Sequence, residues 1–555
     1  MTFGCEPPKT SEVIGPAVLM AGRKGALAAQ VPRRRGMWGI AAGLLLVAVA
    51  TWYAPGRVSG WAPHPGAALG SHIIATSETR DRVTQGDSVV VFAAHPDDEA
   101  LGAGGLIHVA VLAGARVHIV FFTNGDGYLE GVDVGFRTLL STPDRFVQYG
   151  QRRQREGIAA AARLGLSADR LTFLGYPDRG LAVLWGPGWT CDHLYLSPYT
   201  RRDHSPYSLA HRPGVGYCGQ HVLEDVESVL RRERPTIIVS HHAEDTHRDH
   251  WAAGAFVMAA LEHLRAQDVA WAKTVRVWPY LVHHARWPVP QAYAPDLALV
   301  PPGDLLTTGA AWTEYPLDQA DQDAKRMAVL EYHTQTQLLR PYMLSFVRRN
   351  ELFDMHCSSV PLAIKGEGLP VAAPEFWDRL PSAIKGMPGD SLISATEGSL
   401  KLDTVGFAQD SAHLYVAVRL RRAAIREAQY RVVATLFYKD GHMARLRLQF
   451  QAPQALTALQ SQPRDLPLPP GAVGRSVGRR INIVVPLAGA GNPASLLVHV
   501  ETMGPLRTPV ERSPWALVYL ERPPGAQARQ ALAEVSGIGA GPKKFDTLEL
   551  ELRHR

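Results

Sequence analysis

The chain has 555 residues, of which 46% are hydrophobic and 20% are charged, a composition that supports more than one folded domain and excludes a wholly disordered protein. Its net charge of +6 is small for this length, and no motif combines aromatic with basic residues. We therefore expect no nucleic acid among its partners.

The first predicted element is a charge-free apolar run at 37–53. A helix over this run would extend about 26 Å, enough for the core of a bilayer. Basic residues outnumber acidic ones in the preceding segment, 1–36, which favours a cytoplasmic tail and export of the remaining chain. We expect a single-pass anchor in the inner or cell membrane, with secretion after cleavage of an Ala-x-Ala site at 48–50 as the alternative. The stretch 54–85, rich in Pro, Gly, Ala and Thr, is predicted to be a linker.

A polar string, HPDDE at 95–99, lies between an apolar run at 88–94 and a helix-like stretch at 100–112. The apolar run predicts a buried strand, so the polar side chains leave its carboxyl end, where open α/β sheets bind ligands. The glycine-rich run at 102–105 lacks the spacing of a dinucleotide-binding loop. We interpret it as small residues that let the helix pack close to the sheet.

Two of the four cysteines, Cys191 and Cys218, lie in one irregular segment at 181–220. Export would place them in an oxidising compartment, where a disulfide closing this loop stabilises the fold by about 3 kcal/mol. The segment is too long for an ordinary connection. Its aromatic residues either form a wall for a ligand with apolar faces and polar edges or pack the loop onto the core. They are Trp185, Trp189, Tyr195, Tyr199, Tyr207 and Tyr217.

A second polar string, HRDH at 247–250, follows another apolar run and opens a predicted helix that ends near residue 265. Both strings are therefore expected on the same rim of one sheet. Together they supply His95, Asp98 and His250, a set of three ligands that suits zinc with a position left open, or another divalent metal. A 2-His-1-carboxylate iron site is a rival interpretation, which the absence of a β-barrel pattern around the strings disfavours.

The neighbouring polar residues are predicted to perform acid–base chemistry. Asp97 cannot easily share the metal with Asp98, because adjacent side chains leaving a tight turn diverge, so it is free to accept the proton of an attacking water. His247 is placed one helical turn before a metal ligand, where it can stabilise an oxyanion or protonate a leaving amine. Asp249 or Asp245 is expected to hold the ring of His247 in one tautomer.

Six segments between residues 87 and 353 carry a resemblance to known proteins. They are 89–106, 123–127, 153–156, Asp178, 245–250 and 325–335. Together they resemble the PIG-L/LmbE-like family of zinc-dependent N-acetylglucosaminyl deacetylases. The resemblance implies a Rossmann-like, mostly parallel sheet with flanking helices over residues 86–357, and hydrolysis of an N-acetyl group on a glucosamine unit.

The resemblance also implies roles by position. His95, Asp98 and His250 match the family's zinc ligands, and Asp97 matches its general base. His247 matches the histidine that stabilises the tetrahedral intermediate. Arg153 and Asp178 match positions that contact the sugar.

Beyond residue 370 the periodicity changes from helical to alternating, which predicts an all-β sandwich over 370–555. The predicted strands are 401–407, 413–420, 430–439, 443–451, 481–485, 496–501, 515–521 and 547–552. In the strand at 443–451, Leu446, Leu448 and Phe450 face one way, while Arg445, Arg447 and Gln449 face the other. Through 402–403 and 410–418 this region resembles carbohydrate-binding sandwich modules of the family-nine or DOMON-like kind.

Location and chemistry combine into one expectation. The chain is predicted to be a membrane-tethered zinc hydrolase that removes N-acetyl groups from a glycan or polysaccharide outside the cytoplasm. The alternative is a glycan-binding surface protein whose α/β domain holds a metal but has no catalytic activity.

Overall fold

The computed structural model describes residues 75–76, 82–137, 141–307, 311–354, 358–359, 362–363, 376–377, 380, 382–386, 398–460, 465–505 and 509–520. All of them belong to one compact unit, His72–Arg555. The predicted membrane segment at 37–53 and the predicted strand at 547–552 lie outside the described residues. Within the described ranges, no helix is both long and apolar enough to cross a bilayer.

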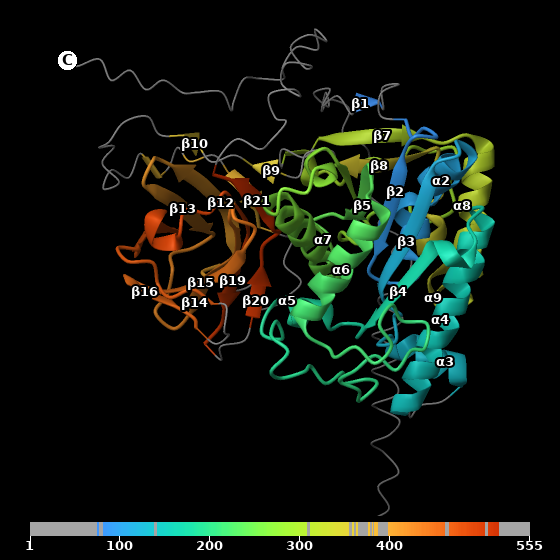
Figure 1. Cartoon of the computed structure of the whole chain (residues 1–555), viewed down its shortest axis with the longest axis horizontal. Helices are drawn as coiled ribbons and strands as arrows, with labels where there is room; N and C mark the ends of the chain where they lie inside the picture. The colour runs from blue at the N-terminus through green and yellow to red at the C-terminus, as the bar shows by residue number, and fades with distance from the viewer. Residues whose placement is uncertain are drawn as a thin grey trace, which may run out of the picture. The chain divides into compact units, whose positions relative to one another are not determined.

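A five-stranded parallel sheet forms the centre of the N-terminal half (Figure 1). Its strands are β2 (Ser88–Ala93), β3 (Arg116–Thr123), β4 (Leu171–Tyr176), β5 (Ile237–His241) and β6 (Arg276–Tyr280). Their spatial order is β4-β3-β2-β5-β6. Starting from β2, the chain adds β3 and β4 on one side of the sheet and then returns to add β5 and β6 on the other side. This topology confirms the predicted parallel α/β fold and creates a switch point between those two strands.

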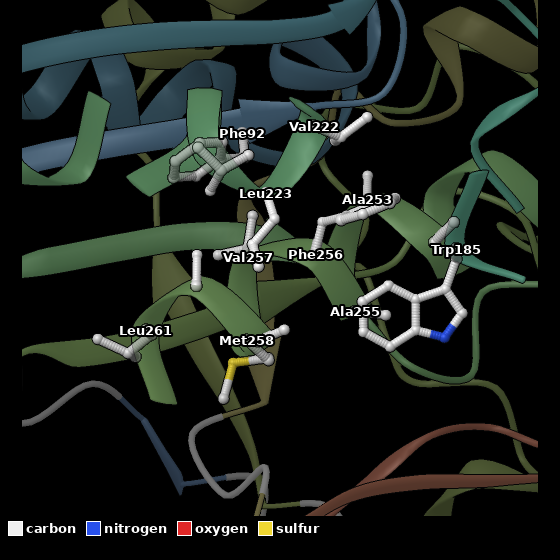
Figure 2. Packing of buried hydrophobic residues seen from close by; sticks show 14 of the residues in the cluster. Phe92, Trp185, Val222, Leu223, Ala253, Ala255, Phe256, Val257, Met258 and Leu261 are labelled. Carbon is white, nitrogen blue, oxygen red and sulfur yellow. The ribbon is translucent and has the colours of Figure 1, made fainter. Parts of the chain in front are cut away.

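Helices cover both faces of this sheet. They are α2 (Asp98–Leu112), α3 (Leu129–Phe136), α4 (Pro143–Arg163), α5 (Leu181–Trp185), α6 (Gly219–Glu233), α7 (Arg248–Ala266), α8 (Gln319–Glu331) and α9 (His333–Leu344). Val90 and Phe92 of β2 join a core with α5, α6 and α7, part of which Figure 2 shows. Val89 and Val91 join a second core with α2, α4 and α8. Burial on both faces explains why β2 is a continuous apolar run.

A smaller sheet, which the sequence did not predict, fixes the position of α2. It pairs β7 (Trp312–Pro316) with β8 (Asn350–Asp354) and with β1 (Ala75–Thr76). Helix α2 is interrupted at Ala103, where the backbone leaves the helical region. Glu351 of β8 accepts the N–H of Gly105 at 2.8 Å, and Lys325, paired with Glu351 at 2.6 Å, donates to the carbonyl of Leu101 at 2.8 Å. This buried pair therefore satisfies backbone groups that the interruption releases.

The C-terminal region forms two mostly antiparallel sheets, which we call the C-terminal β-domain. One sheet has the order β10-β12-β13-β18-β17 with β11 beside β12, and the other has the order β16-β15-β14-β19-β21-β9 with β20 beside β19. The strands are β9 (Ser358–Ser359), β10 (Leu362–Ala363), β11 (Ser382–Lys385), β12 (Leu402–Gln409), β13 (His413–Leu420), β14 (Gln429–Phe437), β15 (Met443–Gln451), β16 (Ala455–Ala458), β17 (Val473–Val477), β18 (Arg480–Pro486), β19 (Ser495–Met503), β20 (Pro509–Arg512) and β21 (Ala516–Tyr519). A common core that includes Phe407, Val416, Val432 and Leu448 joins the two sheets.

Seven of the eight predicted strands of this region are confirmed as β12, β13, β14, β15, β18, β19 and β21. The prediction missed the short strands β9, β10, β11, β16, β17 and β20, which lie at or beside the sheet edges. Short edge strands bury few side chains, so they leave a weak alternating pattern.

The glycines of α2 are required by close packing, as the sequence suggested. A Cβ atom at Gly102 would lie 2.0 Å from the ring of Tyr280, which is fully buried and donates a hydrogen bond to the carbonyl of Phe92 at 2.9 Å. Because that ring cannot retreat without losing its bond, an added methyl group has to displace the helix.

We predict that Gly102→Ala lowers the free energy of unfolding by about 1–3 kcal/mol, the usual cost of overpacking a core. Urea denaturation measures the change. Gly303→Ala is the control, because no atom lies within 4 Å of a Cβ at that position. Equal stability of the two variants would contradict the close-packing explanation.

Candidate active site

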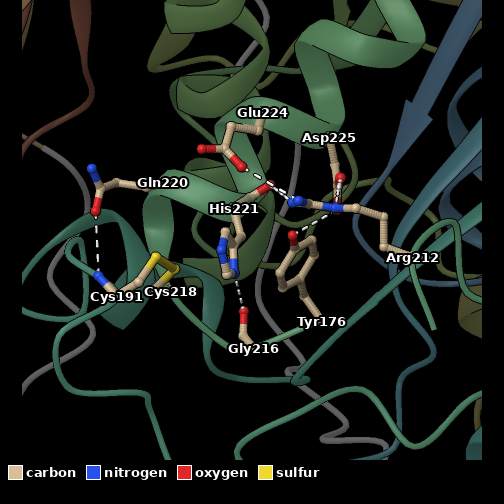
Figure 3. The surroundings of a disulfide bond; sticks show 9 residues. All are labelled: Tyr176, Cys191, Arg212, Gly216, Cys218, Gln220, His221, Glu224 and Asp225. Carbon is tan, nitrogen blue, oxygen red and sulfur yellow. Dashed lines mark hydrogen bonds and ion pairs between the residues drawn. A yellow bond between two sulfur atoms is a disulfide. The ribbon is translucent and has the colours of Figure 1, made fainter. Parts of the chain in front are cut away.

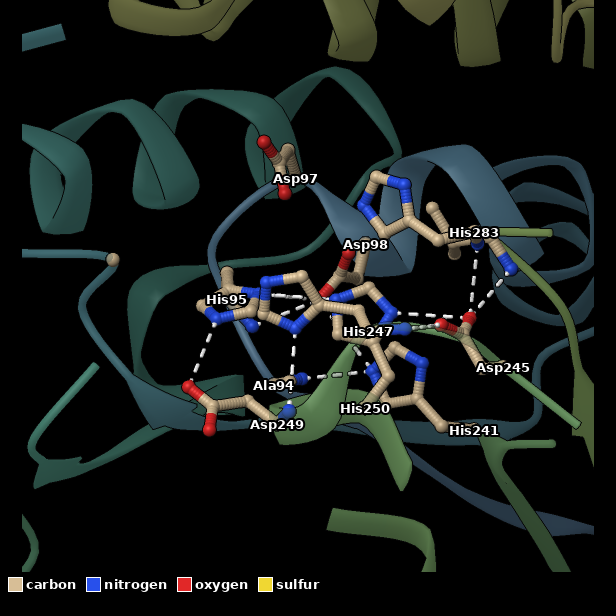
Figure 4. Close-up of polar contacts among 12 residues, drawn as sticks. Ala94, His95, Asp97, Asp98, His241, Asp245, His247, Asp249, His250 and His283 are labelled. Carbon is tan, nitrogen blue, oxygen red and sulfur yellow. Dashed lines mark hydrogen bonds and ion pairs between the residues drawn. The ribbon is translucent and has the colours of Figure 1, made fainter. Parts of the chain in front are cut away.

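Both polar strings lie at the switch point of the parallel sheet (Figure 4). The first leaves the carboxyl end of β2 and begins α2, and the second connects β5 to α7. Because β2 and β5 are adjacent and parallel, the two connections meet on one rim of the sheet. The structure therefore brings together the residues that the sequence placed on a common rim.

Three predicted metal ligands converge on one point. His95 Nδ1 lies 3.3 Å from Asp98 Oδ2 and 3.1 Å from His250 Nε2, and those last two atoms are 3.2 Å apart. A tetrahedral zinc ion with bonds of about 2.0–2.1 Å has ligand atoms about 3.3 Å apart. The triangle therefore has the dimensions of one face of a zinc site.

Two further carboxylates fix how the ligand rings are oriented. Asp178 Oδ1 lies 3.1 Å from Nε2 of His95, and Asp245 Oδ2 lies 3.1 Å from Nδ1 of His250. When both rings are neutral and each donates its outer N–H to the carboxylate, the nitrogen facing the triangle carries a lone pair. Three lone-pair atoms, the third from Asp98, then face one another without a proton between them. This donor set fits a divalent cation.

The electrostatics of the triangle also favour a cation. Burial alone would raise the pKa of Asp98, but His250 and the other imidazoles hold that pKa well below its usual range. Burial lowers the pKa of His250 to about 4, so this ring is neutral at neutral pH. Burial would lower the pKa of His95 as well, yet the carboxylate of Asp178 raises it well above the ordinary value. The position of His95 therefore favours positive charge, either as a proton on the ring or as a cation bound in its place.

Two histidines that the sequence analysis did not single out line the same site. His241, the last residue of β5, lies with its ring centroid 4.1 Å from that of His250. Its Nε2 accepts the N–H of Ala94 at 2.9 Å, which occupies the lone pair and disfavours a ligand role. His283, which follows β6, stacks on Tyr342 with ring centroids 5.6 Å apart. The sequence signal that could have identified His241 and His283 was their position at or just after the carboxyl ends of strands.

Asp97, the predicted base, occupies a strained loop beside the triangle. Its φ of 142° is a conformation that residues other than glycine rarely adopt, as is common at functional sites. Burial raises the pKa of Asp97 to about 7, although the guanidinium of Arg153 opposes this rise. A carboxylate with such a pKa can accept and return a proton at neutral pH.

Arg153, a predicted sugar contact, is buried and holds this loop. Its Nη2 lies 3.0 Å from Asp97 Oδ2 and donates to the carbonyl of Pro96 at 2.6 Å, while Nη1 donates to the carbonyl of Gly125 at 3.3 Å. The described contacts of the guanidinium thus position the base. A contact with a sugar stays a prediction.

Asp178, the other predicted sugar contact, is only 4% exposed. Besides its bond to His95, it accepts the N–H of Gly127 at 2.7 Å. Both carboxylate oxygens are therefore engaged within the protein, in an arrangement that positions the ring of His95.

The expectation that Asp249 or Asp245 holds the ring of His247 through its carboxylate differs from the structure. The Asp249 carboxylate accepts the N–H groups of Arg179 at 2.5 Å and Leu181 at 3.1 Å, because the first turn of α7 directs it toward the start of α5. Asp245 orients His250 instead. The backbone N–H of Asp249 lies 3.3 Å from Nδ1 of His247.

The contact with the Asp249 backbone determines which nitrogen of His247 can donate a hydrogen bond. Since Nδ1 accepts a hydrogen bond, the proton of a neutral ring lies on Nε2. Burial and the neighbouring His250 and His95 rings lower the pKa of His247 well below its usual value, so the ring is neutral. A neutral imidazole with a proton on Nε2 is a hydrogen-bond donor, as oxyanion stabilisation requires.

The irregular segment after β4 is closed by a disulfide between Cys191 and Cys218 (Figure 3). Tyr176 of β4 donates to Asp225 of α6 at 2.7 Å, and Arg212 of the segment forms an ion pair with the same carboxylate. The segment is thereby joined covalently to the start of α6 and electrostatically to its second turn.

The aromatic residues of this segment divide into two groups. The packing interpretation applies to the buried ones, which are Trp185, Trp189, Tyr207 and Tyr217. Tyr195 and Tyr199 are only half-buried. The guanidinium of exposed Arg179 lies over the ring of Tyr199, 5.6 Å from the ring centroid. Arg179 directly follows Asp178, the residue that orients His95. These two tyrosines remain available as a wall beside the site.

We predict that Asp178→Asn weakens zinc affinity by about 10- to 100-fold, because an amide no longer accepts the proton of the His95 ring in the same way. Competition with a chromophoric chelator measures this affinity. Asp192→Asn, at an exposed carboxylate of the same region, serves as the control. Unchanged zinc affinity with a raised KM would instead make Asp178 a direct substrate contact.

Comparison with known proteins identifies part of the chain. Residues 90–261 match the family described as PIG-L: GlcNAc-PI de-N-acetylase. The 1D-myo-inositol 2-acetamido-2-deoxy-alpha-D-glucopyranoside deacetylase of Mycolicibacterium vanbaalenii is 43% identical over 86 residues, which are 16% of this chain and 28% of that protein. A putative glucosamine-6-phosphate deaminase-like protein of Bacteroides thetaiotaomicron is 22% identical over 227 residues, covering 36% of this chain and 31% of the relative. The chain thus spans under a third of the length of each of these two relatives.

Among solved structures, the N,N'-diacetylchitobiose deacetylase from Pyrococcus horikoshii is 16% identical and covers 46% of this chain and 74% of that chain. Its TM-score of 0.25 is too low to carry an argument. The family match contains both polar strings, from His95 to His250. The similarity to the PIG-L family therefore covers residues 90–261, which are under half of the chain.

Proposed function

We propose that the protein is a metal-dependent hydrolase that removes N-acetyl groups from N-acetylglucosamine-type units. The observation that carries the proposal is the convergence of three lone-pair atoms beside Asp97 and a hydrogen-bond donor, His247. The family match and the deacetylase named among the relatives support this reaction and a 2-acetamido sugar as its substrate.

His95, Asp98 and His250 would hold the metal, for which zinc is the first candidate. When bound, zinc supplies Lewis acidity, which polarises an amide carbonyl and lowers the pKa of a coordinated water to about 7. Asp178 and Asp245 keep the two ligand rings oriented for this role.

The protein's own groups then provide proton transfer and charge stabilisation. Asp97 accepts the proton of the attacking water, whose oxygen forms the new bond to the amide carbon. His247 donates from Nε2 to the oxyanion that develops on the carbonyl oxygen. The C–N bond breaks as a proton reaches the departing nitrogen, from Asp97 or from His247, and acetate and a free amine are released.

The substrate is proposed to be an extended glycan outside the cytoplasm. Half-buried Tyr195 and Tyr199, together with exposed Arg179, offer flat faces and a polar tip beside the site, which suit sugar rings. The Cys191–Cys218 disulfide supports an oxidising compartment. The apolar run at 37–53 supports a membrane anchor, with a secreted form as the alternative.

We predict that Asp97→Asn reduces kcat by about 10²- to 10⁴-fold while the protein keeps its zinc, because the amide cannot accept a proton. Acetate release gives kcat, and atomic absorption gives the metal content of the same samples. A rate equal to that of the unmodified protein would remove Asp97 from the mechanism.

His250→Ala is expected to abolish both zinc binding at micromolar free metal and acetate release, since it removes one of three ligands. Full zinc occupancy of the folded variant would contradict the ligand assignment. His263→Ala, on the same helix but distant in sequence from the site, is the matched control and should bind zinc normally.

Acetate release from N-acetylated oligosaccharides, with free N-acetylglucosamine alongside, tests the function itself. We expect release from the oligomers by the zinc-loaded protein, and little from the monosaccharide, because the aromatic wall contacts neighbouring sugar units. Zinc binding together with oligosaccharide binding but no release would favour the glycan-binding alternative.

A further inference from the structure

Helix α7, which carries His250, is held at its first turn by the C-terminal β-domain. Trp251 directly follows the metal ligand and donates from its indole nitrogen to the carbonyl of Ser513 at 3.1 Å. In return, the indole of Trp515 donates to the backbone carbonyl of Trp251 at 3.0 Å. Both tryptophans are buried. Two hydrogen bonds therefore link the residue next to His250 to one short segment of the β-domain.

Trp515 also presses α7 against the end of β5. A Cβ at Gly254 would lie 2.6 Å from the carbonyl oxygen of His241 and 3.1 Å from the Trp515 ring. At Gly254 the helix therefore packs closely against both the end of β5 and this indole. His241 in turn lies 3.4 Å from Asp98 Oδ2 and packs on the ring of His250. A shift of α7 away from β5 would therefore change the distance between His250 and Asp98, the two proposed ligands that His241 contacts.

The ring of Trp251 is enclosed by charged and aromatic groups of the β-domain. The guanidinium of Arg512 lies 4.6 Å from the centroid of this ring, and His499 meets it edge-on at 4.9 Å. Glu501 fixes Arg512 through two contacts of 3.0 and 2.9 Å. A cation over a desolvated indole face is a strong, directional contact. Trp251 is consequently held in one orientation.

A second contact of the β-domain reaches the loop that orients His95. Arg445 is fully buried and donates to the carbonyl of Trp185, the last residue of α5, at 2.7 Å, with its guanidinium 4.4 Å from the Trp189 ring centroid. The first residue of α5, Leu181, donates to Asp249. Arg445 was expected to lie on the face of its strand opposite the apolar side chains. That face is covered by the α/β domain.

We propose that the C-terminal β-domain positions the metal site, and that Trp515 is the positioning residue for the ligand His250. The inference rests on the proposed metal site where it is tested by zinc affinity, and it is tested independently of metal by hydrogen–deuterium exchange. One face of the sheet formed by β14, β15 and β19 packs on α7, so this face serves to support the helix. A carbohydrate on that face would have to displace the helix.

The experiment compares three variants of the full chain. Trp515→Phe removes the indole N–H and keeps an aromatic ring between the β-domain and Gly254. Trp377→Phe makes the same exchange at a buried tryptophan whose cluster lies on the other sheet. Glu262→Gln alters a contact between the β-domain and the far end of α7, where Tyr519 donates to Glu262 at 2.9 Å.

Two readouts are measured for each variant, zinc affinity by chelator competition and hydrogen–deuterium exchange of the metal-free protein over residues 245–255. We expect Trp515→Phe to weaken zinc affinity about tenfold, the effect of losing a group that orients a ligand, and to speed exchange in the first turn of α7. Trp377→Phe and Glu262→Gln should keep zinc affinity within about twofold of the starting protein even where their Tm falls.

The inference is overturned if Trp515→Phe folds and leaves both readouts unchanged, or if all three variants weaken zinc affinity equally. Should Trp515→Phe fail to fold, Trp251→Phe, which removes the bond to Ser513, carries the same expectation. If the starting protein binds no zinc, the proposed function fails, and the exchange readout alone decides whether the β-domain holds α7.

Discussion

The site depends on one electrostatic constraint, the meeting of the Asp98 carboxylate with nitrogens of His95 and His250 in a buried space. The rings of His95 and His250 could not both keep a lone pair directed at the Asp98 carboxylate if their outer nitrogens had no acceptor for a proton. Asp178 and Asp245 prevent this by accepting the outer N–H of each ring. The two orienting carboxylates are therefore as necessary to the arrangement as the ligands.

Those carboxylates are in turn fixed by the backbone around the switch point. Asp245 accepts the N–H groups of Val282 and His283, each at 3.0 Å, at the end of β6. Asp178 accepts the N–H of Gly127, after β3. Because backbone donors at strand ends have positions set by the sheet, the carboxylates cannot rotate away from the rings. The parallel sheet thus supplies the rigidity that a metal site requires.

The same rigidity extends beyond the α/β domain. One hydrophobic core includes Phe256 and Ala259 of α7 together with Leu497, Trp515 and Leu517 of the β-domain. Such a continuous core resists separation of the two regions, since parting them would expose aromatic and aliphatic surface to water. The β-domain is accordingly part of the framework that carries the site.

The sequence by itself determined the parallel α/β class, most strands of the β-domain, and the common rim on which His95, Asp98 and His250 lie with Asp97 and His247, because periodicity and strand-end motifs are local patterns. Tertiary structure decided which carboxylate serves which ring. Asp249 or Asp245 was expected at His247, yet the Asp249 carboxylate accepts backbone N–H groups at the start of α5 and Asp245 contacts His250. Tertiary structure also decided that the strand face carrying Arg445 is covered, so that this residue is buried. Such pairings join residues far apart in the chain, and their partners are set by packing, which no local pattern encodes.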